Sequence, residues 1–134
     1  MARGVALTDI HPAVAAGIND QDLDGLMALY APDAALVLLD GSVVTGTAAI
    51  REQYAGILEL QGRMTLRTRY ALEIGDLAVL SNEWTLTAGD QRMSAVTHEV
   101  ARRQSEGGWL YVIDHPFAGL EPEEAAAYAA AMEA

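Results

Sequence analysis

The chain of 134 residues contains no cysteine and no lysine, and it has only three histidines. Without cysteine there are no disulfides, no thiolate nucleophiles and no thiolate metal ligands. The histidines lack the spacing of a zinc motif, and neither a glycine-rich phosphate loop nor a G-x-S-x-G motif occurs. The sequence therefore predicts no metal and no cofactor, which leaves acid–base chemistry or plain binding.

Positive charge is also scarce, because 8 basic residues face 19 acidic ones and the formal net charge is −11. Nucleic acid and anionic membranes need a basic face, so neither is a predicted partner. We interpret Arg67 and Arg69, which share one strand face, as part of a solvated or interface surface. No run of 18 apolar residues occurs, and Asp9 and His11 interrupt the apolar N-terminal segment. A cytoplasmic location without membrane contact is the expectation.

One acidic segment imitates the start of a calcium loop. Residues 20–25 read Asp-Gln-Asp-Leu-Asp-Gly, but the twelfth position of the loop, which needs a bidentate Glu, is Ala31. The apolar spacing also predicts a helix from residue 23. We interpret the acids as the cap and first turn of that helix.

Hydrophobic residues make up 51% of the sequence, which favours a single folded domain over disorder. In the first third they recur with helical spacing and predict three helices. The short apolar run 34–39 predicts a buried strand that turns at Asp40-Gly41 into a second strand, 42–45. The helices are expected from about Ile10 to Ile18, from about Leu23 to Tyr30, and from Gly46 to about Leu60.

From Arg63 onward the hydrophobic period changes to two, which predicts strands over 77–87, 92–104 and 109–115 after a first strand from 63. Helices followed by such strands indicate an α+β fold in which N-terminal helices pack on a strongly curved antiparallel sheet and leave a conical cavity. We expect the cone domain over 1–120 and an alanine-rich helical tail over 121–134.

Three segments of the chain resemble the nuclear transport factor 2-like superfamily. Residues 22–34 resemble its helix-to-strand signature, residues 46–52 its third helix and residues 108–115 its closing strand. The resemblance covers about residues 8–118 and is nearest to the SnoaL-like and ketosteroid-isomerase-like branches. It implies the cone fold and a homodimer formed through the outer face of the sheet. It is less specific for activity, since this fold holds isomerases, cyclases, hydrolases, dehydratases and non-catalytic binders.

The residues expected of a ketosteroid isomerase are missing. By resemblance, the carboxylate base falls on Leu38, the oxyanion-hole tyrosine on Val14 and the protonated carboxylic acid near His98. Leucine cannot accept a proton and valine cannot donate a hydrogen bond, so steroid isomerase chemistry is not supported. Asp40 has the strand parity of Leu38 and is a minor alternative base, although it lies in a predicted turn.

His98 and His115 are the predicted catalytic residues. The resemblance places both on long strands with their side chains toward the cavity, and the pKa of imidazole suits proton transfer near neutral pH. Strand alternation then turns the neighbouring Glu99 and Asp114 to the opposite face. The alternative is that each histidine is a satisfied polar residue of a pocket or an interface.

The predicted ligand-binding residues are mainly aromatic and apolar. Asn82 and Trp84 share one face of the strand 77–87, and Tyr30 and Tyr70 occupy apolar positions. For the tyrosines, packing in the core is the alternative. The full predicted set is Tyr30, Leu38, Tyr70, Asn82, Trp84, Tyr111, Ile113 and Phe117.

Two functions remain open at this point. The first, which the resemblance implies, is that of a SnoaL-like protein that binds a small hydrophobic molecule and carries out cofactor-independent acid–base chemistry of the isomerase, cyclase or lyase type. Alternatively, the chain is a non-catalytic module for ligand binding or dimeric association on the same fold.

Overall fold

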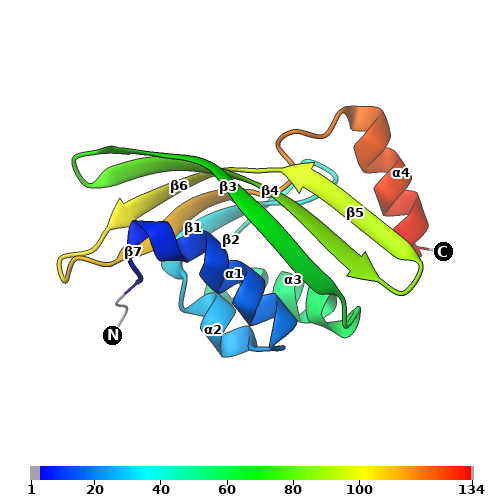
Figure 1. The fold of residues 1–134 in the computed structure, drawn as a ribbon, viewed down its shortest axis with the longest axis horizontal. Coiled ribbons are helices and arrows are strands. Elements are labelled where there is room, and N and C mark those ends of the chain that lie inside the picture. Colours follow the sequence, from blue (N-terminus) through cyan, green and yellow to red (C-terminus); the bar gives the residue numbers. More distant parts are fainter. Residues whose placement is uncertain (1–3, 134) are drawn as a thin grey trace.

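The structure, a computed structural model, describes residues 4–133. Residues 1–3, at the start of the expected cone domain, and residue 134, at the end of the expected helical tail, lie outside the described residues. A 3-10 turn and three helices precede or interrupt the early strands, and a fourth helix ends the described chain (Figure 1). They are η1 (Leu7–Asp9), α1 (Ile10–Asn19), α2 (Leu23–Met27), α3 (Thr47–Glu59) and α4 (Pro122–Glu133).

Seven strands form one sheet in the order β2-β1-β7-β6-β4-β3, with β5 paired to β4 beside β6. Helices α1, α2 and α3 lie on one side of this curled sheet, and α4 lies beyond β5 (Figure 1). The predicted α+β cone is therefore confirmed. One feature was not predicted, because β1 and β7 pair in parallel while the other pairs are antiparallel. The strands are β1 (Tyr30–Val37), β2 (Val43–Thr45), β3 (Arg63–Ile74), β4 (Leu77–Ala88), β5 (Gln91–Val96), β6 (His98–Arg103) and β7 (Trp109–His115).

Two local differences from the predicted elements affect the site. The second helix ends at Met27, and Tyr30 begins β1 instead of closing the helix. The predicted strand 92–104 is divided at Thr97, which separates β5 from β6. The Thr97 backbone N–H donates to the carbonyl of Asn82, so the chain stays attached to β4 at the break.

Close packing joins α1 to α2, and the side chain of Asn19 joins α1 to β3. The absence of a Cβ at Gly17 lets Leu26 of α2 approach α1, since a Cβ there would lie 2.6 Å from the Leu26 side chain. Asn19 at the end of α1 donates to the Met64 carbonyl (2.9 Å) and accepts from the Met64 N–H (2.7 Å). These contacts fix α1 across β3 and set the depth of the space between helices and sheet.

Two β-bulges shift the alternation of side chains along the long strands. In the β6–β7 pair, Val100 opposes Ile113 and Ala101 opposes Tyr111, so Val112 has no direct partner. In the β3–β4 pair, the register shifts at Arg69 in the same way. After each bulge the alternation is shifted by one residue, so the residues that would otherwise point to the outer face point toward the helices.

Candidate functional site

A pocket lies between the helices and the concave face of the sheet, with a cavity volume of about 190 Å³. One water needs roughly 10–15 Å³ of such space, so the pocket has room for about a dozen non-hydrogen atoms. Most of its wall is apolar, and the lining residues come mainly from α1, α3 and six of the strands. The apolar lining includes Val14, Ile18, Leu36, Leu38, Ile57, Met64, Leu66, Trp84, Leu86, Met93 and Phe117.

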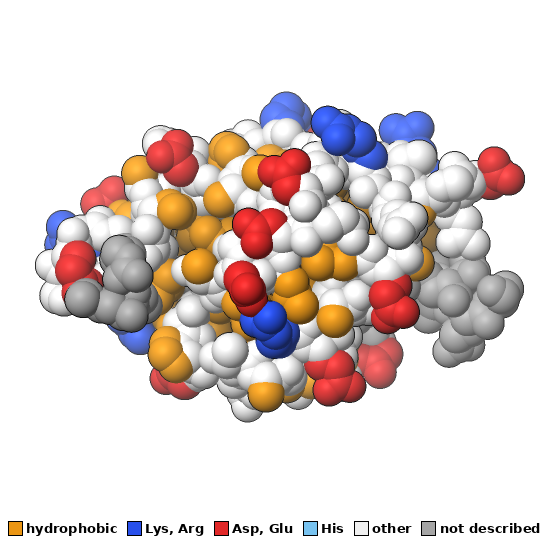
Figure 2. Space-filling view, turned by 90° about the horizontal axis from the view of Figure 1, so that it is seen from below, with side chains coloured by type: hydrophobic (Ala, Val, Ile, Leu, Met, Phe, Trp, Pro, Cys, Tyr) orange, Lys and Arg blue, Asp and Glu red, His pale blue; other side chains and the backbone are white. Residues whose placement is uncertain are grey.

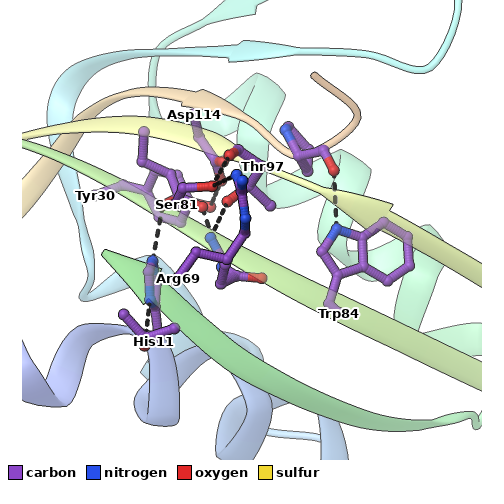
Figure 3. Close-up of polar contacts among 11 residues, drawn as sticks. His11, Tyr30, Arg69, Ser81, Trp84, Thr97 and Asp114 are labelled. Carbon is purple, nitrogen blue, oxygen red and sulfur yellow. Dashed lines mark hydrogen bonds and ion pairs between the residues drawn. The ribbon is translucent and has the colours of Figure 1, made fainter. Parts of the chain in front are cut away.

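The aromatic part of this wall is held rigidly. The Trp84 indole Nε1 donates to the Pro116 carbonyl at 2.8 Å (Figure 3). The Trp84 ring meets the Phe117 ring edge to face, with 5.9 Å between the ring centroids. The ring of Trp84 is thus oriented toward the cavity, with its only polar atom already engaged.

Polar groups collect at one part of the pocket, around the carboxyl of Asp114. Tyr30 donates a hydrogen bond to Asp114 Oδ2 (Figure 3). The Tyr30 and Tyr54 hydroxyls lie 2.5 Å apart. Because the single hydroxyl hydrogen of Tyr30 goes to Asp114, Tyr54 must donate to Tyr30. Asp114 Oδ1 makes no hydrogen bond with the described residues, and Asp114 lines the pocket. One side of the carboxyl is therefore held by tyrosines while the other is free to meet a ligand.

A second carboxyl, that of Glu99, lies on the neighbouring strand directly across from Asp114. Glu99 Oε1 is 2.8 Å from His11 Nε2, and the other His11 nitrogen is 2.8 Å from Thr68 Oγ1. Glu99 Oε2 accepts from Asn82 Nδ2 at 3.2 Å. His11 and Glu99 are 1% and 3% exposed, so this is a fully buried ion pair when His11 is protonated. Both oxygens of Glu99 are thus occupied by protein groups.

Burial and the neighbouring carboxyl determine the charge of Asp114. Burial in the apolar pocket, together with the negative charge of Glu99, raises the pKa of Asp114 to about 8, although the hydrogen bond from Tyr30 opposes the rise. Burial also raises the pKa values of the Tyr30, Tyr54 and Tyr111 hydroxyls, which keeps these groups protonated. At neutral pH the site therefore contains a largely protonated carboxyl beside three neutral tyrosines.

Five of the predicted ligand-binding residues line the pocket, namely Leu38, Asn82, Trp84, Tyr111 and Phe117. Tyr30 lies behind the wall, where it holds Asp114, and contacts the ring of Tyr111 at 5.2 Å between centroids.

The predicted inward orientation of His98 and His115 is wrong. Thr97, Glu99, Asp114 and Pro116 line the pocket, so alternation turns His98 and His115 to the outer face. His98 is exposed there, and His115 opposes it across the strands. Partial burial and the nearby His98 lower the pKa of His115. For His115 the cause is the bulge at Val112, because it brings Tyr111 and Asp114 to the same face although they are three residues apart.

Two predicted ligand-binding residues also lie outside the pocket for the same reason. Ile113 follows the bulge in β7 and is 46% exposed on the outer face. Tyr70 follows the bulge in β3 and packs beneath the guanidinium of Arg69, which is 5.7 Å from the ring centroid. Asp40, the minor alternative base, is exposed and accepts hydrogen bonds from Ser42.

Sequence reasoning missed the polar group of His11, Tyr54, Glu99 and Asp114. A usable signal was present, because Glu99 and Asp114 are carboxylates inside otherwise apolar strand sequences, where an ionised side chain is costly to bury. The bulge at Val112, which turns Asp114 inward, has no such signal.

Within residues 4–133, no cluster of three or more His, Cys, Asp or Glu side chains could hold a metal ion. In the same residues, no helix is long and apolar enough to cross a membrane.

The helix-covered face is acidic and partly apolar. In Figure 2, Asp and Glu side chains are scattered over this face, and hydrophobic side chains are visible between them. An anionic ligand would meet repulsion on approach from this side.

Comparison with known proteins agrees with this architecture. The structure is similar to that of a protein from Thiobacillus denitrificans, provisionally named a calcium/calmodulin-dependent protein kinase type II association domain (TM-score 0.75, 22% identity, 88% of this chain and 98% of that one). It is also similar to an NTF2-like protein of unknown function from Shewanella oneidensis (0.72, 16%, 81% and 93%) and to a ketosteroid isomerase-like protein from Erwinia carotovora (0.67, 18%, 82% and 91%). At these identities the likeness shows the fold alone.

The sequence comparison is more specific. No match was found among curated protein sequences. The profile of the SnoaL-like domain matches residues 13–115, which is most of the chain and includes Tyr54, Glu99 and Asp114 of the polar group but not His11. The chain therefore belongs to the SnoaL-like domain family.

Proposed function

We propose that this protein binds a small, largely apolar molecule in the pocket and transfers a proton to or from it through Asp114, without a cofactor. The observation that carries this proposal is the placement of the Asp114 carboxyl. It is buried in an apolar pocket, held on one side by Tyr30 and free on the other. A carboxyl placed in this way is costly for folding and suits chemistry on a bound molecule.

The raised pKa of Asp114 fits this role. With a pKa of about 8, both forms of the carboxyl are present near neutral pH, so it can act as a general acid or as a general base. Glu99, held by His11 and Asn82, keeps the neighbouring negative charge in place. In this proposal the negative charge of Glu99 raises the pKa of Asp114, and Asp114 transfers the proton.

The supported reaction class is proton transfer at carbon or oxygen next to a carbonyl. Ionised Asp114 would take a proton from the carbon beside the carbonyl, and the resulting carboxylic acid would return it to another atom of the same molecule. Tyr111 lines the pocket, and its hydroxyl makes no hydrogen bond with the described residues, so it can donate to the oxygen that gains charge. Isomerisation and elimination both belong to this class.

Proton exchange provides the test. The purified protein is incubated in D₂O with a panel of small ketones, epoxides and polyketide-like compounds, and deuterium uptake is followed by mass spectrometry and NMR. Molecules extracted from the purified protein join the panel. We expect Asp114→Asn to lower the rate about 10²–10⁴-fold for any compound that the wild type turns over. Unchanged exchange in Asp114→Asn would overturn the proposal.

A second candidate function is ligand binding without catalysis. The observation in its favour is that Val14 and Leu38, at the positions where the resemblance expects an oxyanion donor and a base, both line the pocket as apolar residues. Under this function, the panel contains compounds that bind and none that exchange or react. Asp114→Asn would then change affinity alone.

We further propose that the protein is a homodimer that associates through the outer face of the sheet. Leu72, Val79, Val100 and Ile113 are successive cross-strand neighbours on β3, β4, β6 and β7. Leu72, Val79 and Ile113 are 63%, 43% and 46% exposed, so the row is an apolar band open to solvent. Such a band is typical of a surface that a second copy covers.

A further inference from the structure

The amide of Asn82 is oriented by its neighbours. Asn82 is 4% exposed, and its Nδ2 donates to Glu99 Oε2 at 3.2 Å. Because a carboxylate oxygen accepts and does not donate, the nitrogen must face Glu99 and the amide oxygen must point elsewhere. The hydrogen bond to Glu99 therefore fixes which end of the Asn82 amide is the nitrogen and which is the oxygen.

The amide oxygen has no partner in the described chain. Asn82 Oδ1 is buried, and no donor among the described residues lies within hydrogen-bonding distance of it. Asn82 lines the pocket together with Glu99 and Asp114. Trp84, the next residue of β4 on that face, cannot serve because its Nε1 already donates to Pro116. Buried acceptors are almost always paired, so a donor from a bound molecule is the fitting partner.

The other polar groups of the pocket decide which donor fits. An ammonium group would need a free anion, but His11 and Asn82 already occupy the two oxygens of Glu99, and the free carboxyl of Asp114 is largely protonated at neutral pH. The Tyr111 hydroxyl lines the same pocket without a hydrogen bond to the described residues and can donate to a ligand oxygen. A hydroxyl group both donates and accepts, whereas an N–H group of an amide donates alone.

On the basis of the acid–base function proposed above, we propose that the molecule bound in the pocket carries a hydroxyl group that donates to Asn82 Oδ1. The substrate class is therefore a small, largely apolar alcohol or phenol that also carries the carbonyl group required by the proposed chemistry, with its hydroxyl at the polar part of the pocket, beside Asp114. The remainder of the molecule packs against the apolar wall that contains Trp84 and Phe117.

Matched probes test this inference by isothermal titration calorimetry. Each pair consists of a hydroxyl compound and its methyl ether, which keeps the oxygen and loses the donor: 2-naphthol with 2-methoxynaphthalene, 4-ethylphenol with 4-ethylanisole, and cyclohexanol with methoxycyclohexane. For the wild type, we expect the hydroxyl member of at least one pair to bind roughly tenfold or more tightly than its ether. Binding of no hydroxyl compound, or equal binding within every pair, would overturn the inference.

A substitution of Asn82 tests whether its side chain accepts the hydrogen bond from the ligand hydroxyl. In Asn82→Leu, which keeps the side-chain volume, we expect the preference for hydroxyl over ether to fall to about twofold or less, while the ether still binds. Retention of the full preference would contradict the role of Asn82. Thr85→Val, on the opposite face of β4, is the control and should keep the wild-type preference, since Thr85 contacts Ser94.

This test is separate from that of the proposed function. Failure of the probe experiment removes the hydroxyl class and leaves the loss of exchange in Asp114→Asn intact. Failure of the Asp114 experiment leaves hydroxyl recognition by Asn82 intact, as a property of a binding protein.

Discussion

Glu99 and Asp114 are cross-strand partners on β6 and β7, and both are buried on the side of the sheet that faces the pocket. Two carboxylates so placed in an apolar pocket cannot both ionise at low cost. His11 lies 2.8 Å from Glu99, whereas within residues 4–133 the carboxyl of Asp114 has a side-chain hydrogen bond only from the hydroxyl of Tyr30. The negative charge of the pair therefore belongs on Glu99 and the proton on Asp114. The first two predictions depend on this difference in charge between Glu99 and Asp114.

The first prediction concerns the pH dependence of stability. The pKa of Asp114 is about 8 in the folded protein and has its ordinary value, 3.8, in the unfolded chain, so the folded state binds the additional proton between these pH values. The free energy of unfolding therefore falls as pH rises from about 4 to about 8. Asp114→Asn removes this dependence and should gain stability relative to the wild type over that interval, on the order of a few kcal/mol.

Urea unfolding at pH 5 and pH 9 measures this difference. Asp40→Asn serves as the control, because Asp40 is exposed and its pKa is lowered by hydrogen bonds from Ser42. A constant stability difference between Asp114→Asn and the wild type across this pH range would contradict the prediction.

The second prediction concerns the buried partner of Glu99. His11→Leu leaves Glu99 buried without a cation and should destabilise the protein by about 3–5 kcal/mol. In the double variant His11→Leu/Glu99→Gln the unpaired charge is absent, so much of the lost stability should return. Thermal unfolding of the two variants, followed by circular dichroism, makes the comparison. Equal destabilisation in both would show that packing of His11, and not its pairing with Glu99, matters.

The third prediction concerns the outward histidines. His98 and His115 do not line the pocket, so the double variant His98→Ala/His115→Ala should keep turnover or ligand affinity within about twofold of the wild type. The measurement is the same exchange or binding assay used for Asp114→Asn. A loss comparable to that of Asp114→Asn would contradict this prediction and show that the histidines take part in catalysis or ligand binding.

The fourth prediction concerns association. Val79 lies in the middle of the exposed apolar row, and an arginine there would place an unpaired charge in a dimer interface. We expect a mass near twice 14.3 kDa by light scattering for the wild type and near 14.3 kDa for Val79→Arg. Asp90→Arg, at the exposed turn between β4 and β5, is the matched control and should remain a dimer. A monomeric wild type would rule out the dimer.

The fold was predictable from sequence because its signals are local. Helical spacing, the turn at Asp40-Gly41 and the change of period at Arg63 each reflect one segment and its own side chains. The parallel pairing of β1 with β7 was not predicted, since it joins segments about 80 residues apart and no local pattern reports it.

The candidate site was only half predictable, and the reason is physical. The extra residue of the β3–β4 pair, Arg69, lies in β3, so alternation along β4 is undisturbed and places Asn82 and Trp84 in the pocket. Asp114 follows the bulge at Val112, and a shift of one residue exchanges the two faces of a strand. Alternation without the bulge therefore directed His115 inward and Asp114 outward, the reverse of the structure.

The protonation state of Asp114 is the measurement that tests the central claim most directly. Carbon-13 NMR of the protein labelled at the aspartate carboxyl carbon follows each carboxyl through a pH titration, and Asp114→Asn identifies the resonance. The account predicts that Asp114 titrates near pH 8 and shifts when a ligand of the pocket binds. Titration near pH 4, the range of an ordinary exposed aspartate, would contradict it.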